Sequence, residues 1–132
     1  MLADDIADFL TSGGIAASML FVGDFPAQPH TALVVTPTGG EGPTRTMSGT
    51  PSHAPLETVR FQLRARATGY TLAEALINSA HVLASGVSER AINSRRYYYI
   101  RPVQSPQYLG FDELNRSLFA CNYSVQRAES TA

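Results

Sequence analysis

The sequence predicts an α+β domain, in which a largely antiparallel or mixed sheet carries two helices on one face in the order α-β-β-β-α-β-β. Three observations predict this class. Segments with the period of a strand outnumber those with the period of a helix. The clearest alternation, in residues 56–67, places one strand face in a core and the other in solvent. Turn residues separate neighbouring strands, which favours hairpins.

Two segments have the period of an amphipathic helix. The first spans residues 2–12, and the following pair Gly13-Gly14 ends it. The second begins at Thr71, where Glu74 completes a capping-box pattern, and ends at Gly86. The predicted buried stripes are Leu2, Ile6, Phe9 and Leu10 in the first helix, and Leu72, Leu76, Ala80 and Leu83, widened by Ala73, Ile77 and Ala84, in the second.

Five strands are predicted, over residues 19–22, 31–36, 56–67, 97–104 and 117–126. Pro37 ends the second of them, and Pro102 confines the fourth to an edge or a bulge. The link before the last strand carries Pro106 and Gly110 and is interpreted as turn-rich. One core is expected to contain Val59, Phe61, Leu63, Leu72, Leu76, Leu83, Phe119, Tyr123 and Val125.

The length of 132 residues suits one domain, which we place at residues 1–127. Residues 37–55 contain four Pro and four Gly, and are predicted to be a long flexible loop that becomes ordered on assembly with a partner. Residues 128–132 are predicted to be a frayed tail.

Composition excludes several kinds of protein. The net charge of −1 provides no basic field for nucleic acid. A single Cys excludes an internal disulfide, and no apolar run is long enough to span a membrane. The chain has no Lys, so a phosphate-loop lysine and a Schiff-base lysine are both excluded.

No catalytic or metal-ligating constellation is evident. His30, His53 and His81 are scattered, and Cys121 lies on the apolar side of a strand, where an inert thiol is expected. The acidic residues of the first helix are interpreted as complementing the helix dipole. We therefore expect neither enzyme activity, nor a cofactor, nor a metal ion.

Arginine and tyrosine residues form the most distinctive polar pattern. Arg60, Arg64 and Arg66 share the polar face of the strand in residues 56–67. Arg95 and Arg96 flank the aromatic run in residues 97–99. Three interpretations remain open: a solvated sheet face, an interface between proteins, or a surface on which single-stranded nucleic acid stacks.

Two C-terminal stretches carry a family resemblance. They are residues 104–113 (QSPQYLGFDE) and 119–125 (FACNYSV), where an aromatic strand leads through a Ser-Pro-x-x-Leu-Gly turn and an acidic hairpin to a last strand. Near the N-terminus, Gly13-Gly14 is followed by Phe21, Gly23 and Pro26. Together these motifs resemble the minor capsid or tail-terminator proteins of tailed bacteriophages. The hairpin departs from the pattern at Leu114, where a small turn residue is common, so its turn type is left open.

The resemblance implies a structural virion protein of the tail and neck, assembled in the host cytoplasm. Such proteins form a hexameric ring that caps the tail tube and meets the head connector or stopper, while genomic DNA passes through the lumen without sequence-specific binding. No membrane is implied. The predicted assembly contacts are Arg60, Arg64, Arg66, Arg95, Arg96, Glu41, Arg45 and Met47. The alternatives are another neck component, such as a head-closure protein, and a single-stranded nucleic-acid-binding module.

Overall fold

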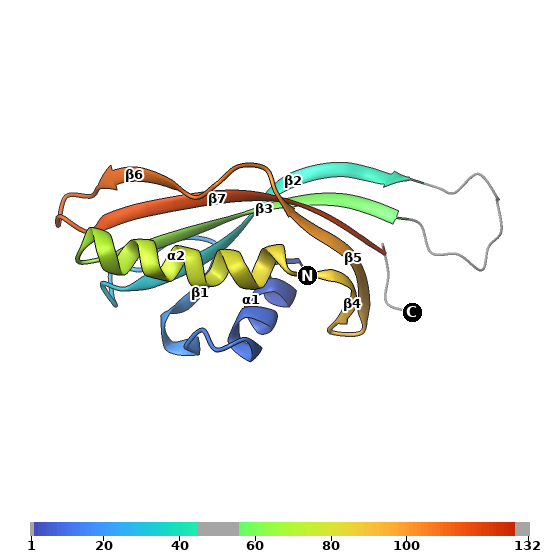
Figure 1. Ribbon diagram of the computed structural model, residues 1–132, viewed down its shortest axis with the longest axis horizontal. Helices are drawn as coiled ribbons and strands as arrows, with labels where there is room; N and C mark the ends of the chain where they lie inside the picture. The colour runs from blue at the N-terminus through green and yellow to red at the C-terminus, as the bar shows by residue number, and fades with distance from the viewer. Residues whose placement is uncertain (1, 45–55, 129–132) are drawn as a thin grey trace.

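A computed structural model describes residues 2–44 and 56–128 of the protein. Figure 1 shows a long curled sheet with both helices packed on one face. The α+β class and the predicted order of helices and strands are confirmed, and two strands, β4 and β6, are additional. The elements are α1 (Leu2–Ser12), a 3-10 turn η1 (Ala17–Met19), β1 (Leu20–Val22), β2 (Ala32–Thr44), β3 (Leu56–Ala67), α2 (Tyr70–Ser85), β4 (Ser88–Ile92), β5 (Arg95–Pro102), β6 (Gln107–Phe111) and β7 (Ser117–Ala128).

The last strand, β7, lies at the centre of the sheet. The strand order is β1-β2-β3-β7-β5-β4, and β6 also pairs with β7. One edge of β7 pairs with β3 along its whole length, and the other edge is shared between β6 and β5. Among the strands of the described residues, only β1 and β2 pair in parallel. Strand β7 therefore holds β3, β5 and β6, which come from separate parts of the sequence, in one sheet.

The second strand extends beyond its predicted end. Pro37 was expected to end it, and residues 37–55 were expected to form one irregular loop. Instead β2 continues to Thr44 in antiparallel pairing with β3, and its register shifts between Pro37 and Gly39. A bulge tolerates both a proline and the positive φ of +103° at Gly39, so the strand resumes after it. Residues 45–55 and 129–132 lie outside the described residues.

Two strands were not predicted. Strand β4 is short, polar and mostly exposed, so it carries almost no hydrophobic signal. Strand β6 lies in the segment interpreted as a turn-rich link, where Gly110 takes a φ of +98° at a register shift against β7. The predicted tail was also one residue too long, because Ala128 belongs to β7 and pairs with Leu56.

The second helix is rotated relative to the prediction. It begins at Tyr70 after Gly69, and no side-chain hydrogen bond caps it. Its buried face comprises Ala73, Leu76, Ile77, Ala80 and Ala84, whereas Leu72 is 58% exposed. Placing Leu72 in the core was therefore wrong: small alanines let the helix pack closely on the sheet, and the larger leucine lies on the outer side.

The other residues predicted for the core do contribute to it. Phe61 and Tyr123 are fully buried and stack with ring centroids 4.9 Å apart. Val59 and Leu83 are partly buried and pack against the core. Leu63, Leu76, Phe119 and Val125 are buried, as is Cys121. The helices of the described residues are too short or too polar for any of them to cross a membrane.

Candidate assembly surface

The arginine row on β3 lies on the sheet face opposite the helices. Arg64 and Arg66 alternate with the buried residues Leu63 and Ala65, as predicted. The loop between β1 and β2, residues 23–31, folds over this face. The row is therefore covered at one end, and the contacts of each arginine decide what it can offer to another protein.

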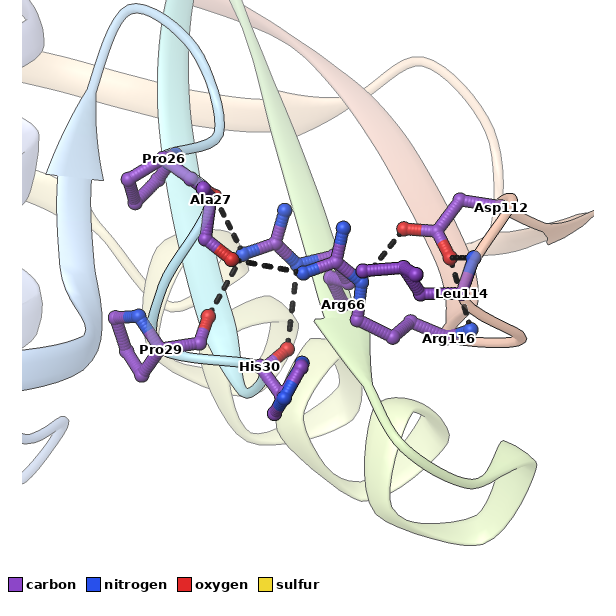
Figure 2. A network of polar contacts seen from close by, with 8 residues as sticks. All are labelled: Pro26, Ala27, Pro29, His30, Arg66, Asp112, Leu114 and Arg116. Atoms are coloured by element: carbon purple, nitrogen blue, oxygen red, sulfur yellow. Dashed lines mark hydrogen bonds and ion pairs between the residues drawn. The ribbon is translucent and has the colours of Figure 1, made fainter.

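Arg66 is only 3% exposed. Its Nη2 donates hydrogen bonds of 2.7 Å to the carbonyl oxygens of both Pro26 and Pro29, and its Nε donates one of 3.2 Å to the carbonyl of His30 (Figure 2). A guanidinium with several donors in one plane suits three carbonyls of a curved loop. Arg66 thus holds the β1–β2 loop of its own chain, contrary to the prediction that it faces a neighbouring subunit.

A second arginine holds the same loop, and its guanidinium group lies beside that of Arg66 (Figure 2). Arg116, in the turn before β7, donates 3.0 Å from Nη1 to the carbonyl of Ala27 and 2.7 Å from Nε to Asp112 Oδ2 (Figure 2). Burial lowers the pKa of the Arg66 guanidinium, the positive charge of Arg116 lowers it further, and Asp112 raises it. The acid therefore offsets part of the cost of placing two buried cations close together.

Arg64 is the third arginine that holds the β1–β2 loop. Its Nη2 donates to the carbonyl of Gly23 at 3.1 Å and contacts Asp24 Oδ1 and Thr36 Oγ1 at 3.2 Å. The Phe25 ring lies close to both Arg64 and Arg66, with its centroid 5.1 Å from Arg64 Cζ and 4.6 Å from Arg66 Cζ. Of Arg60, Arg64 and Arg66, Arg60 is the one that is exposed.

A second polar network joins the N-terminal helix to the sheet. The buried Tyr97 hydroxyl donates to Asp5 Oδ2 at 2.6 Å and accepts from Arg127 Nη1 at 3.0 Å. Arg127 Nε also donates to Glu57 at 2.6 Å, and Arg95 lies 3.5 Å from the same carboxylate. Asp5 was expected only to complement the helix dipole. It is instead a buried acceptor on which β5 and β7 converge.

Because of this network, one of the tyrosines considered for stacking single-stranded nucleic acid is not accessible. Tyr97 is fully buried, so its ring is not accessible for base stacking. Tyr98 and Tyr99 are half-buried, and Arg96 and Arg101 lie over their rings at 5.9 and 4.5 Å. Arg96 itself is exposed.

Arg60 and Arg95 do lie together. Both line a hollow of about 460 Å³ at the base of the β2–β3 hairpin, along with Glu57 and Arg127. The structure therefore brings one residue of the predicted row close to one residue of the tyrosine strand. Glu41 belongs to β2 but its side chain is not described, and Arg45 and Met47 lie outside the described residues.

The thiol of Cys121 lies 3.8 Å from Nδ1 of His81 in helix α2. Tyr123 Oη and His81 Nδ1 are joined by a 2.7 Å hydrogen bond, and Cys121 Sγ donates to the carbonyl of Gln104 at 3.0 Å. Burial raises the pKa of the Cys121 thiol, so the thiol form is favoured. Among residues 2–44 and 56–128, no group of three or more His, Cys, Asp or Glu could hold a metal ion. His30 is exposed, and His53 lies outside the described residues.

An apolar surface that was not predicted from the sequence lies at one end of the molecule. Around β6 and the start of α2, large apolar side chains are exposed to solvent. The apolar residues of β6 would have indicated it, but they were assigned to a link. The exposed residues of this apolar surface are Tyr70 (49% exposed), Leu72 (58%), Tyr108 (45%), Leu109 (55%), Phe111 (67%) and Leu114 (62%).

These features define an α+β domain whose described polar clusters hold its own elements together, while several large apolar side chains remain exposed on its surface. Comparison with known proteins agrees with this class. A family model described as bacteriophage tail terminator protein matches residues 6–128, and the chain belongs to that family. No curated protein sequence matches the chain.

Solved structures show the same fold. One chain, from a structure titled "Virion of native gene transfer agent (GTA) particle", superposes with a TM-score of 0.62 at 7% sequence identity. The match covers 92% of this chain and 93% of that chain. At this identity the similarity concerns the fold alone.

Proposed function

We propose that the protein is a tail terminator whose subunits form a ring, hexameric as the family resemblance implies, on the end of the tail tube of a phage virion. The ring stops growth of the tube and presents a surface to the head connector. The observation that carries this proposal is the family match, which spans residues 6–128 and so nearly the whole chain. The fold shared with a chain from a virion particle supports it.

The proposed role is structural rather than enzymatic. The side chains most suited to acid–base or nucleophilic chemistry are engaged in contacts within the chain. His81 is hydrogen-bonded to Tyr123, and Cys121 is buried with a raised thiol pKa. Asp5 and Glu57 are held by Tyr97 and Arg127. These contacts stabilise the subunit and leave assembly to its surface.

Arg60, Arg95 and Arg96 are proposed assembly contacts, and Glu41, Arg45 and Met47 are proposed with them. Arg60 and Arg95 line one hollow together with Glu57, which lies 3.5 Å from Arg95. Arg64 and Arg66 are not part of this proposed surface because they hold the β1–β2 loop.

Purified tail-tube protein provides the test. We expect tubes grown with this protein to have a uniform length and to carry a ring at one end in electron micrographs, whereas tubes grown without it keep growing. Light scattering of the isolated protein would give the mass of the ring. Binding to head connectors with no effect on tube growth would instead assign the protein to another position in the neck.

A further inference from the structure

The described surface carries an apolar protrusion and an apolar groove in different places. The protrusion, here called the apolar tip, consists of Phe111 at the end of β6 and Leu114 in the turn before β7, which are 67% and 62% exposed. The groove, here called the α1–α2 groove, has a volume of about 570 Å³. Its lining includes Gly13, Ile15, Met19, Leu76, Val82 and Leu83.

The turn that carries the apolar tip is held rigidly. Asp112 Oδ1 accepts hydrogen bonds of 3.0 Å from the backbone N–H groups of Leu114 and Arg116, and Asp112 Oδ2 accepts one of 2.7 Å from Arg116 Nε. Arg116 in turn donates to the carbonyl of Ala27. The apolar side chains thus stand on a backbone that is already ordered, which lowers the entropy cost of docking.

The α1–α2 groove is also formed in advance. Gly13, directly after α1, lies so close to α2 that a Cβ added to it would come within 2.8 Å of both Leu83 methyl carbons. Glycine therefore sets the close approach of the two elements at this point. Val82, at the groove's rim, is 70% exposed.

The chemistry of the groove selects its occupant. All of its lining residues are uncharged. Two other hollows in the described part of the chain contain charged groups: Glu57 with arginines in one, and Asp8 with Arg90 in the other. An apolar side chain in either of those two would remove charged groups from water without offering them a hydrogen bond, whereas in the α1–α2 groove it meets uncharged side chains.

We propose that the apolar tip of one copy docks in the α1–α2 groove of the next copy. Tip and groove are different surfaces, so the contact is heterologous, and each bound subunit keeps a tip or a groove available for another copy. Such a contact closes into a ring when its rotation allows, and in this respect the inference rests on the proposed terminator ring.

The size of the tip predicts how the ring assembles. An aromatic residue buries about 150–250 Å², so two side chains fall well short of the roughly 800 Å² per partner of a stable two-body interface. A single tip contact is therefore weak. In a closed ring each subunit is held on both sides, which raises the effective concentration of every contact. We expect monomers and complete rings rather than a stable dimer.

Cysteine cross-linking between two singly substituted proteins tests the contact directly. Leu114→Cys and Val82→Cys, carrying tags of different size, are mixed and oxidised, and the wild type with its buried Cys121 is the control. We expect a product containing both tags, formed at least 10-fold faster than either homodimer. No mixed product, or equally fast linking of Leu114→Cys to itself, would overturn the proposal.

Charge substitution gives a second readout. Phe111→Asp and Leu114→Asp should melt at the wild-type temperature but weaken assembly at least 10-fold in sedimentation experiments. Val103→Asp is the matched control, since Val103 is 60% exposed and belongs to neither surface. Tip variants that assemble as well as Val103→Asp would contradict the proposal.

The two proposals can fail separately. If the mixed cross-link forms in rings that leave tube growth unchanged, the terminator function is wrong and the tip contact stands. If the protein stops tube growth but the mixed cross-link does not form, the tip contact is wrong and the function stands.

Discussion

The hydroxyl of Tyr97 lies 2.6 Å from the carboxylate of Asp5, joining strand β5 to helix α1 across 92 positions of sequence. Both residues are buried, and Arg127 reaches the same hydroxyl. Together these contacts connect the first helix to β5 and to the central strand β7, so the N-terminal and C-terminal ends of the chain depend on each other for stability.

Replacing Tyr97 with Phe should therefore destabilise the protein. A buried acceptor that loses its donor costs about 1–3 kcal/mol, which urea denaturation at pH 7 would measure. Tyr98→Phe is the control, because Tyr98 is half-buried and lies outside this network. An equal loss in both variants would show that the Asp5 contact contributes nothing specific.

The same variant predicts a dependence on alkaline pH. Burial and the hydrogen bond to Asp5 raise the pKa of Tyr97 above its ordinary value of 10.0. The folded protein thus retains a proton that the unfolded chain releases, so the stabilisation is complete below about pH 10 and is lost as the pH rises further. The difference in unfolding free energy between wild type and Tyr97→Phe should shrink above pH 10. A constant difference would contradict this assignment.

Truncating Phe61 and truncating Leu72 should have very different effects on the free energy of unfolding. Phe61 is fully buried against Tyr123, so Phe61→Ala should cost about 3–5 kcal/mol of unfolding free energy. Leu72 is 58% exposed, and Leu72→Ala should change stability by only about 0.5 kcal/mol. Chemical denaturation of both variants measures the difference. A large loss from Leu72→Ala would place that residue in the core, as its helical spacing first indicated.

Arg66→Met should release the β1–β2 loop. Three carbonyl groups would lose their donor, at a cost of about 2–4 kcal/mol, and amide hydrogens of residues 23–31 should exchange faster. Arg96→Met, at an exposed position, is the control. Unchanged exchange in the loop would mean that Phe25 and Arg64 hold it without Arg66.

Asp112 predicts a loss of stability in acid. Burial raises the pKa of its carboxyl group, but hydrogen bonds from Arg116 and Leu114 outweigh burial and hold the pKa below its ordinary value. The carboxylate therefore stabilises the fold above about pH 4, and this contribution is lost as the pH falls through the lowered pKa. Asp112→Asn should melt below the wild type at pH 7, and the gap should close toward pH 3. A gap of equal size at both pH values would contradict this.

Much of the fold could be predicted because the signals are local. Strict alternation over residues 56–67 predicted β3 with its bounds, and the helical stripe predicted α1. Strand β6 was missed because its residues show no local alternation of polar and apolar side chains. Its strand conformation is defined by pairing with β7. The position of Leu72 was wrong because a period of 3.6 residues does not resolve a rotation by one position when alanines form the packed face.

The candidate assembly surface, too, could be predicted only in part from the sequence. By itself the sequence determined that Arg64 and Arg66 share one face of β3, because side chains alternate along any strand. It also carried the motifs that resemble the tail terminator family, which the family match confirms. Whether those arginines face solvent or their own chain depended on where residues 23–31 fold, and only the tertiary structure decided it. A guanidinium binds whichever carbonyls come within about 3 Å, and that proximity arises from pairings between residues 36 to 41 positions apart.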